Sequence, residues 1–366
     1  MSDQDLFYVL ALLKVEGVGD IMAKKLLNHF GSAEAVFKSK SGQMAVIDGV
    51  GSVLLKNFKD KSVFEKANSE MEFLKSNLVN VSFFKEESYP ERLKHCIDSP
   101  VLIFSRGNIN LKNKKIISIV GTRQITSYGT EFCRNLVEEL APLDPVIVSG
   151  FAYGVDIVAH QRAMDFNLQT IGVMAHGLNQ IYPKSHRKYS AQIDENGGFV
   201  TEFWSTSNPD KENFVRRNRI VAGMAEATLV IESAEKGGSL ITANLANDYN
   251  RDVFAVPGRA TDKYSQGCNN LIKTQRANVL TSAADLIYML NWNIETKPKP
   301  VQKQLFINLE PEEQKVYDFL LKNGRELLDS IALQCDFPIY KISGLLLNME
   351  LKGVIRPLPG KLFEAI

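Results

Sequence analysis

The sequence has few cysteines, no long hydrophobic run and almost no net charge. Its four cysteines among 366 residues show neither a C-x-x-C motif nor paired spacing, which excludes a disulfide scaffold and predicts reduced thiols in the cytoplasm. The first residues, MSDQDLFYVL, do not join a basic stretch to an apolar one as a secretion signal does. No segment approaches the roughly 20 consecutive apolar residues that span a bilayer, so we expect no membrane partner.

The low net charge excludes one way of binding nucleic acid. Lysine and arginine (43) nearly cancel aspartate and glutamate (42), which leaves +1. A protein that binds DNA over its whole surface needs a large basic excess, so any nucleic-acid site here has to be local. The composition, 45% hydrophobic and 23% charged, is typical of a globular protein with a sizeable core.

Changes in sequence pattern divide the chain into four parts. We expect a helical, helix-hairpin-helix-like domain at residues 1–82, a Rossmann-like domain at 83–292, a linker at 293–304 and a winged-helix domain at 305–366. The linker contains Lys297-Pro298-Lys299-Pro300, which cannot continue a helix.

One pattern occurs twice in the N-terminal domain. Val15-Glu16-Gly17-Val18-Gly19 and Ile47-Asp48-Gly49-Val50-Gly51 each precede an apolar helical segment. Such glycines allow a tight turn and leave backbone amides free at a helix N-terminus, where a DNA phosphate can bind. Lysines and acids balance in this region, so a helical packing domain whose glycines only cap helices is the alternative.

Short apolar runs alternate with helical segments between Lys114 and Leu290. This alternation predicts a parallel sheet covered on both faces, an α/β, Rossmann-like doubly wound fold. The candidate strands are Ile116–Val120, Val146–Ser149, Thr170–Ala175, Phe199–Thr201, Thr228–Ile231 and Val253–Val256, with an additional strand at Val101–Ser105. The candidate helices are Thr130–Leu140, Val155–Asp165, Phe214–Met224 and Leu240–Asn250. Ligands bind such sheets outside the carboxyl ends of the strands.

The C-terminal part has the order of a winged helix. The segments Pro311–Lys322, Leu327–Gln334 and Ile339–Leu351 carry helical periodicity and precede a two-stranded wing at 353–363. The third helix, which would enter a major groove, is poor in arginine and mixed in charge. A protein contact is at least as well supported there as DNA recognition.

Glycine turns that open a helix follow several of the strands. Each turn offers backbone amides to an anion, but the spacing matches neither G-x-G-x-x-G nor a Walker loop, so a nucleotide cofactor is not indicated. An arginine in the first turn would bind a phosphate through two parallel hydrogen bonds. A row of such turns on one sheet edge, close to basic residues, suits an extended polyanion. The residues concerned are Gly121 and Arg123, Ser149 and Gly150, Lys184, and Gly237, Gly238 and Ser239.

A basic cluster beside an aromatic residue is the sharpest local feature. Phe214 precedes Arg216, Arg217 and Arg219, which suits a single-stranded nucleic acid because guanidinium groups bind phosphates while a base stacks on the ring. On a helix, Arg216 and Arg219 share a face and Arg217 turns away, so the three cannot serve one ligand. A solvated helix with Phe214 in the core is the alternative.

Catalytic and metal sites are weakly supported. Asp156 and His160 are spaced i, i+4 and could meet as an acid–base pair, but a helix-start aspartate and a packed, hydrogen-bonded histidine are favoured. His176 and His186 lack a third ligand at characteristic spacing, so we expect no metal.

An ordered set of motifs runs through residues 85–290. These are V-G-T-R at 120–123, S-G-F-A-Y-G-V-D at 149–156, Y-P-K at 182–184, F-V-R-R-N-R-I-V-A-G at 214–223, G-G-S-L-I-T-A at 237–243, P-G-R at 257–259 and G-C-N-N-L-I at 267–272. Together they resemble the DprA/Smf family of DNA-processing proteins. The sequence departs from the family's usual residues at Asn179, His186, Val215 and Arg276, and none of these departures removes a basic contact.

The resemblance implies a non-enzymatic homodimer that protects single-stranded DNA entering during natural transformation and loads a RecA-type recombinase onto it. It implies no cofactor and no metal. The family's DNA-binding residues correspond here to Gly121, Arg123, Ser149, Gly150, Lys184, Phe214, Arg217, Asn218, Arg219, Gly237, Gly238 and Ser239. A nucleotide-metabolising, phosphoribohydrolase-like enzyme on a related Rossmann fold is the alternative, although its P-G-G-x-G-T motif and following glutamate are replaced by Lys236-Gly237-Gly238-Ser239-Leu240. A structural adaptor acting through its terminal domains is a third possibility.

Overall fold

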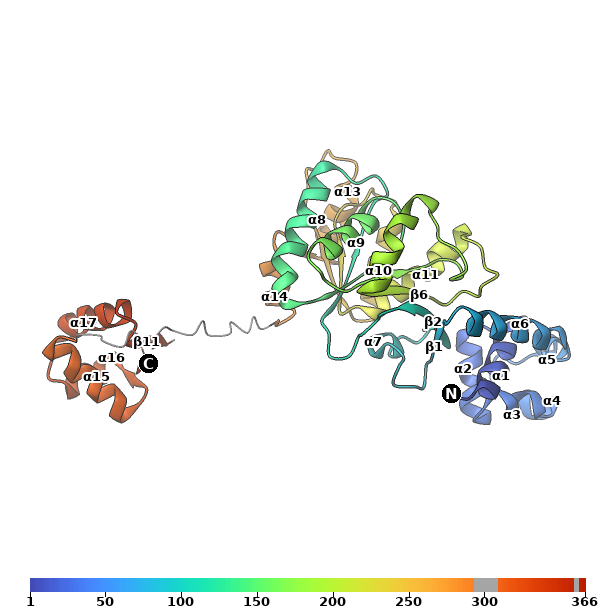
Figure 1. Cartoon of the computed structure of the whole chain (residues 1–366), viewed down its shortest axis with the longest axis horizontal. Helices are drawn as coiled ribbons and strands as arrows, with labels where there is room; N and C mark the ends of the chain where they lie inside the picture. The colour runs from blue at the N-terminus through green and yellow to red at the C-terminus, as the bar shows by residue number, and fades with distance from the viewer. Residues whose placement is uncertain (293–308, 359–361) are drawn as a thin grey trace. The chain divides into compact units, whose positions relative to one another are not determined.

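The computed structural model describes residues 1–292, 309–358 and 362–366 and contains two compact units, one within Met1–Ile294 and the other within Glu295–Ile366 (Figure 1). The predicted linker at 293–304 lies outside the described residues, and the division into four parts remains a prediction. None of the helices in the described ranges is long and apolar enough to cross a membrane.

Short helices form the N-terminal part of the first unit. Gly17 and Gly49 have φ angles of 89° and 90°, and Gly19 and Gly51 are the N-caps of the helices that follow. The repeated sequence pattern therefore produces two turns of the same geometry. The helices are α1 (Asp3–Lys14), α2 (Asp20–Phe30), α3 (Ala33–Lys38), α4 (Ser41–Met44), α5 (Ser52–Asn57) and α6 (Ser62–Ser76).

A nine-stranded sheet forms the centre of the first unit, in the order β1-β2-β6-β5-β4-β3-β7-β8-β9. The strands from β6 across to β9 run parallel, whereas β1 and β2 add an antiparallel edge beside β6. The prediction of an α/β, doubly wound sheet is confirmed. The strands are β1 (Asn80–Phe83), β2 (Leu102–Gly107), β3 (Ile116–Val120), β4 (Val146–Ser149), β5 (Thr170–Val173), β6 (Gly197–Thr201), β7 (Ala227–Val230), β8 (Asp252–Ala255) and β9 (Asn278–Val279).

Helices cover both faces of this sheet. Val120 of β3 joins the buried cluster formed with α7, α11, α12 and α13, whereas its neighbour Ile119 joins the cluster formed with α8, α9 and α14. Alternate side chains of a strand point to opposite faces, so a strand covered on both sides is apolar throughout. The helices are α7 (Glu91–Lys94), α8 (Ser127–Leu140), α9 (Val155–Asp165), α10 (Ser190–Glu195), α11 (Lys211–Met224), α12 (Gly238–Asp248), α13 (Gln266–Lys273) and α14 (Ala283–Met289), with 3-10 turns η1 (Ala141–Leu143) and η2 (Lys184–Tyr189).

The N-terminal helices pack against the β1–β2 edge (Figure 1). Their buried side chains form one cluster with Leu102 and Phe104 of β2. Polar contacts extend this packing: the Lys14 ammonium lies 3.9 Å from the ring centre of Trp204, and the Glu70 carboxylate accepts a hydrogen bond of 2.9 Å from the Ser205 amide. The helices and the sheet therefore belong to one unit.

The second unit has the predicted winged-helix order. Its strands form a three-stranded sheet in the order β10-β12-β11, so the wing gains a third strand that the sequence does not predict. Lys341 and Lys352 at the ends of α17 are paired at 2.5 Å with Glu312 and Glu313 of α15. The elements are α15 (Pro311–Asn323), β10 (Glu326–Leu327), α16 (Leu328–Gln334), α17 (Ile339–Leu351), β11 (Ile355–Leu358) and β12 (Leu362–Ala365).

Candidate nucleic-acid interface

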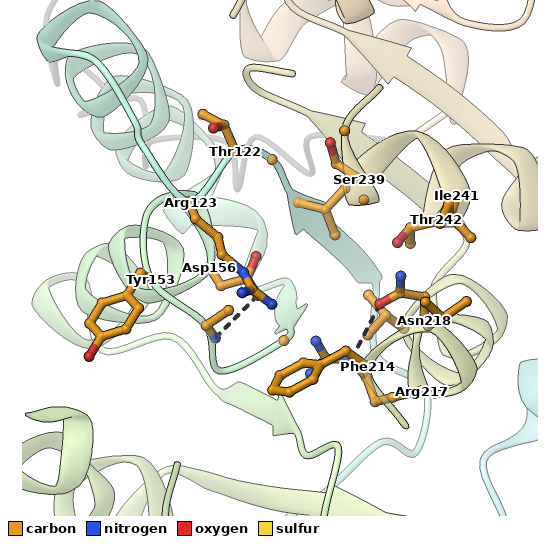
Figure 2. Close-up of a pocket in the computed structure, with 18 of the residues that line it drawn as sticks. Thr122, Arg123, Tyr153, Asp156, Phe214, Arg217, Asn218, Ser239, Ile241 and Thr242 are labelled. Carbon is orange, nitrogen blue, oxygen red and sulfur yellow. Dashed lines mark hydrogen bonds between the residues drawn. The ribbon is translucent and has the colours of Figure 1, made fainter. Parts of the chain in front are cut away.

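The order of the strands places a topological switch between β3 and β7. From β3 the chain adds β4, β5 and β6 on one side, then returns to add β7, β8 and β9 on the other. In doubly wound sheets the loops diverge at such a point and leave a crevice outside the carboxyl ends of the strands. A cavity of about 670 Å³ lies here, lined by the loops after β3, β4 and β7 and by α11 and α12, and we call it the switch-point cavity (Figure 2).

Most of the site residues predicted from the sequence come together in this cavity. Figure 2 shows Arg123 reaching in from the loop after β3, with Phe214 and Arg217 of α11 on another side. Ser149, Lys184 and Arg219 are not among its lining residues. The predicted residues that line it are Gly121, Arg123, Gly150, Phe214, Arg217, Asn218, Gly237, Gly238 and Ser239; their part in DNA binding remains a prediction.

The N-terminus of α12 opens onto the cavity. Gly237 is its N-cap and provides no side-chain hydrogen bond. The amides of Gly238 and Ser239 have no hydrogen-bond partner in the part of the chain that the structure describes. A Cβ atom at Gly238 would have no other heavy atom within 4 Å, so there is open space beside this turn. Free amides and the positive end of the helix dipole form an anion site.

A guanidinium group and an aromatic ring meet inside the cavity. Phe214 is half-buried, with the Arg123 and Arg217 guanidinium carbons 5.2 Å and 5.9 Å from its ring centre. Arg123 is exposed and has no ion pair or side-chain hydrogen bond within the described ranges. The ring is therefore not a core residue, and the Arg123 charge is available to a ligand.

Arg217 forms the inner wall of the cavity. It is 5% exposed, donates a hydrogen bond to the Val173 carbonyl, and has its Nε 3.4 Å from Asn218 Oδ1. Burial lowers the pKa of Arg217, and the nearby Asp156 carboxylate acts in the opposite direction. A Cβ atom at Gly150 would lie 2.2 Å from Asp156 Oδ2 and 2.6 Å from an Arg217 nitrogen. Only glycine fits here, which explains the glycine turn after β4.

Arg216 and Arg219 face the opposite side of α11. Both guanidinium groups are paired with Asp20 of α2, at 3.2 Å and 3.0 Å, and with Glu202 at 2.6 Å and 2.5 Å. Their shared face, as predicted from spacing, is directed at the N-terminal helices and not at the cavity. The geometry gives the predicted DNA contact of Arg219 no support. Asp20, the first residue of α2, also accepts a hydrogen bond from the Val101 amide at 2.9 Å. The N-terminus of α2 therefore carries an acidic side chain that is bound within the unit.

Two further predicted residues lie outside the cavity. Ser149 is fully buried and donates to the Ile119 carbonyl at 2.6 Å, which joins β4 to β3. Lys184 is exposed at the start of η2. The loop before it lies beside the cavity, because the Tyr182 ring packs edge-on against Phe214 at 5.9 Å between ring centres.

The residues considered for catalysis make structural contacts. His160 is fully buried, with Nδ1 2.7 Å from the Thr170 hydroxyl and Nε2 2.6 Å from the Gly150 carbonyl. This burial lowers the pKa of His160 to about 4. Asp156 accepts from the Ala152 amide at 3.3 Å. No group of three or more His, Cys, Asp or Glu side chains in the described residues is placed to hold a metal ion, and all four cysteines are buried and unbonded.

Part of the lining is not among the binding residues predicted from the sequence. Lys211 and Lys236 add two lysines to the cavity, and Thr122, Tyr153 and Thr242 add polar groups. Lys236 directly precedes the glycine turn after β7 and Lys211 begins α11, so their positions next to recognised motifs could have indicated them.

Two family models match the chain from residue 80 onward. A family model described as DNA recombination-mediator protein A matches residues 80–291, and one described as DprA winged helix domain matches residues 299–361. Protein Smf of Escherichia coli (strain K12) is 34% identical over 281 residues, 75% of this chain and 74% of the relative. DNA processing protein DprA of Bacillus subtilis (strain 168) is 32% identical over 272 residues, 74% of this chain and 91% of the relative.

Solved structures give the same family. The X-ray structure of DNA processing protein A from Streptococcus pneumoniae has a TM-score of 0.64 at 28% identity and covers 77% of this chain and 97% of that one. A Helicobacter pylori structure, described as giving insights into the unique single-stranded DNA binding mode of DNA processing protein A, has a TM-score of 0.52 at 29% identity and covers 58% of this chain and 95% of that one.

Proposed function

Because this chain belongs to the DNA recombination-mediator protein A family, the DprA/Smf proteins, we propose that it binds single-stranded DNA in the switch-point cavity during DNA processing. One observation carries the proposal. An uncommitted guanidinium group, a half-buried aromatic ring and an open helix N-terminus line one cavity at the carboxyl edge of the sheet. Single-strand sites combine positive charge for the phosphates with an aromatic ring for a base, and a helix N-terminus offers amides to a phosphate.

Each group has a separate task in the proposed complex. Arg123 turns from the ring to a phosphate, which frees the face of Phe214 for a base. The amides of Gly238 and Ser239 bind a second phosphate, as helix N-termini do for anions. The buried Arg217 keeps a fixed positive charge behind both. These contacts address the backbone and one base face, so little sequence preference is expected.

A relative supports the choice of ligand. The H. pylori protein A is described with single-stranded DNA and shares the fold of this chain. The alternative, a phosphoribohydrolase-like enzyme, needs an acidic side chain for catalysis in the cavity. The acid that lines it, Asp156, lies beside Arg217 and accepts a hydrogen bond from the Ala152 amide. These structural contacts of the carboxylate favour a binding site over a catalytic one.

The wider role follows from the family. We propose that the chain acts without catalysis as a homodimer, protects the strand during natural transformation, and loads a RecA-type recombinase onto it. The C-terminal winged helix is proposed to contact protein, since Lys341 of α17 and the C-cap residue Lys352 are both paired with glutamates.

A mobility-shift comparison tests the proposal. Wild type should bind single strands in preference to duplex, and Arg123→Ala should weaken the single-strand complex. Arg134→Ala is the matched control, because Arg134 is exposed on α8 and lines neither this cavity nor its neighbour described below. Equal binding by wild type and Arg123→Ala, or hydrolysis of a 5′-mononucleotide by the purified protein, contradicts the proposal.

A further inference from the structure

A second cavity of about 940 Å³ lies on the same edge of the sheet. It is lined by the loops after β3, β7 and β8 and by the start of α8, and its residues include Tyr128, Glu232, Arg259, Lys263 and Tyr264. Its volume is within the range of about 300–1,000 Å³ that ligand pockets occupy. The site residues predicted from the sequence do not include any of these.

The second cavity shares a wall with the switch-point cavity. The loop after β3 lines the first cavity with Val120–Arg123 and the second with Thr126–Tyr128. The loop after β7 likewise lines the second cavity with Glu232 and the first with Ala234 and residues 236–239. The Tyr264 hydroxyl donates to the Gln124 side chain, so the far wall is tied to the shared loop. A strand leaving Arg123 along this edge reaches the second cavity next.

The chemistry of the second cavity repeats that of the first. Arg259 and Lys263 are exposed, and neither forms an ion pair or a side-chain hydrogen bond within the ranges that the structure describes. Tyr128 is 51% exposed, and its hydroxyl donates to the Pro257 carbonyl at 3.2 Å, which fixes the ring. Free cations beside a fixed aromatic ring are the elements of a single-strand site.

One of the two acids of this cavity is buried. The Glu232 carboxylate is occupied by the Thr126 amide at 2.9 Å and the Thr126 hydroxyl at 2.5 Å, which hold the start of α8. Glu232 is 4% exposed, whereas Arg259, Lys263 and Asp262 are exposed, so two cations stand against one acid on the accessible surface of the cavity. This balance of accessible charge favours an anionic ligand.

We infer that the second cavity is an additional binding site for single-stranded DNA, in which Arg259 and Lys263 bind phosphates and Tyr128 stacks on a base beyond those held in the switch-point cavity. The inference rests on the proposed function, because a strand bound in the first cavity is what reaches the second.

Strand length separates the two sites. Fluorescence anisotropy should be measured with oligothymidylates of about 4 to about 16 nucleotides. The shortest strands should bind Arg259→Ala and Lys263→Ala as they bind wild type. On the longest strands each substitution should lower the slope of log affinity against log salt by about 0.7. Tyr128→Leu should lose at least about fivefold in affinity there, and Tyr128→Phe, which keeps the ring, should not.

Two control variants and the Arg123→Ala variant are measured in the same assay. Arg134→Ala and Lys273→Ala remove exposed charges that line neither cavity and should bind as wild type; thermal unfolding confirms that all variants are folded. If the second-cavity variants match wild type at every length while Arg123→Ala is weakened, the inference is wrong and the proposed function stands. Losses that are equal at all lengths also overturn the inference. If Arg123→Ala matches wild type as well, the proposed function fails first.

Discussion

Substitution of Asp20 by asparagine should destabilise the Met1–Ile294 unit through one buried charge. The Asp20 side chain is 13% exposed and is paired with Arg219, which is 9% exposed. Removing one partner of a buried pair costs about 3–5 kcal/mol, because the other charge stays desolvated. Asparagine can still accept from the Val101 amide, and Glu202 still binds both arginines. We therefore expect the lower end, about 3 kcal/mol.

Arg216→Gln is the matched control for this substitution. Arg216 binds the same two carboxylates, but its side chain is 53% exposed. An ion pair of an exposed side chain contributes at most about 1 kcal/mol, since water screens it, and both carboxylates keep their pairing with Arg219. Asp20 and Arg216 each have two ion-pair partners, so the difference between the two variants in the free energy of unfolding reports the effect of burial.

Intrinsic fluorescence in a urea titration is the assay. Trp204 and Trp292 are the two tryptophans of the sequence, and both are buried in the Met1–Ile294 unit, so their signal reports unfolding of that unit alone. The urea midpoint should fall clearly for Asp20→Asn and little for Arg216→Gln. Equal midpoints for Asp20→Asn and wild type, or an equal loss for both variants, would refute the reasoning from burial.

Three further substitutions test other parts of the account. Phe214→Ala should cost about 1–3 kcal/mol of single-strand binding if the ring stacks on a base, whereas Phe214→Tyr should bind as wild type in the same anisotropy assay. Gly238→Ala should keep the thermal midpoint, since its Cβ has open space, and should weaken binding by blocking the amides; unchanged affinity would exclude α12 as a phosphate site. Burial lowers the pKa of His160 to about 4 from 6.5, so the unfolded state binds a proton that the folded state excludes. The free energy of unfolding should therefore fall, by up to about 3 kcal/mol, as pH drops from about 6.5 to 4, and His160→Gln should lack this component in urea titrations at both pH values.

The sequence predicts the fold where the pattern is local. β3, β4, α9 and α17 have the predicted bounds, because buried parallel strands are continuous apolar runs and their helices keep a regular period. β1 and β9 are missed because they lie at sheet edges: β1 has no fully buried residue and β9 is two exposed residues long. Pairing with a neighbouring strand, and not their own composition, makes them strands.

Site residues were likewise predictable where the signal is local. The glycine turns and Phe214 each belong to a single loop or helix, so their spacing in the sequence was enough to indicate them. Arg219 differs because Asp20, its partner, lies 199 residues away in the chain, and no local pattern shows that the two meet. Arg259 and Lys263 are not among the predicted site residues, because their loop forms part of a cavity only where it folds against Tyr128. The near-zero net charge has a related explanation, because acids such as Asp20 and Glu202 neutralise basic residues that face away from the cavity.

The most direct test of the proposed site compares two arginines. Arg123 lines the cavity without an ion pair in the described residues, and Arg216 is paired with acids on the far face of α11. Single-strand affinity should be measured for both alanine variants as a function of salt. Arg123→Ala should lower the log–log slope by about 0.7, the value for one phosphate on a single strand, and Arg216→Ala should leave the slope of wild type. An unchanged slope for Arg123→Ala, or an equal decrease for Arg216→Ala, would contradict the claim that the switch-point cavity binds the strand.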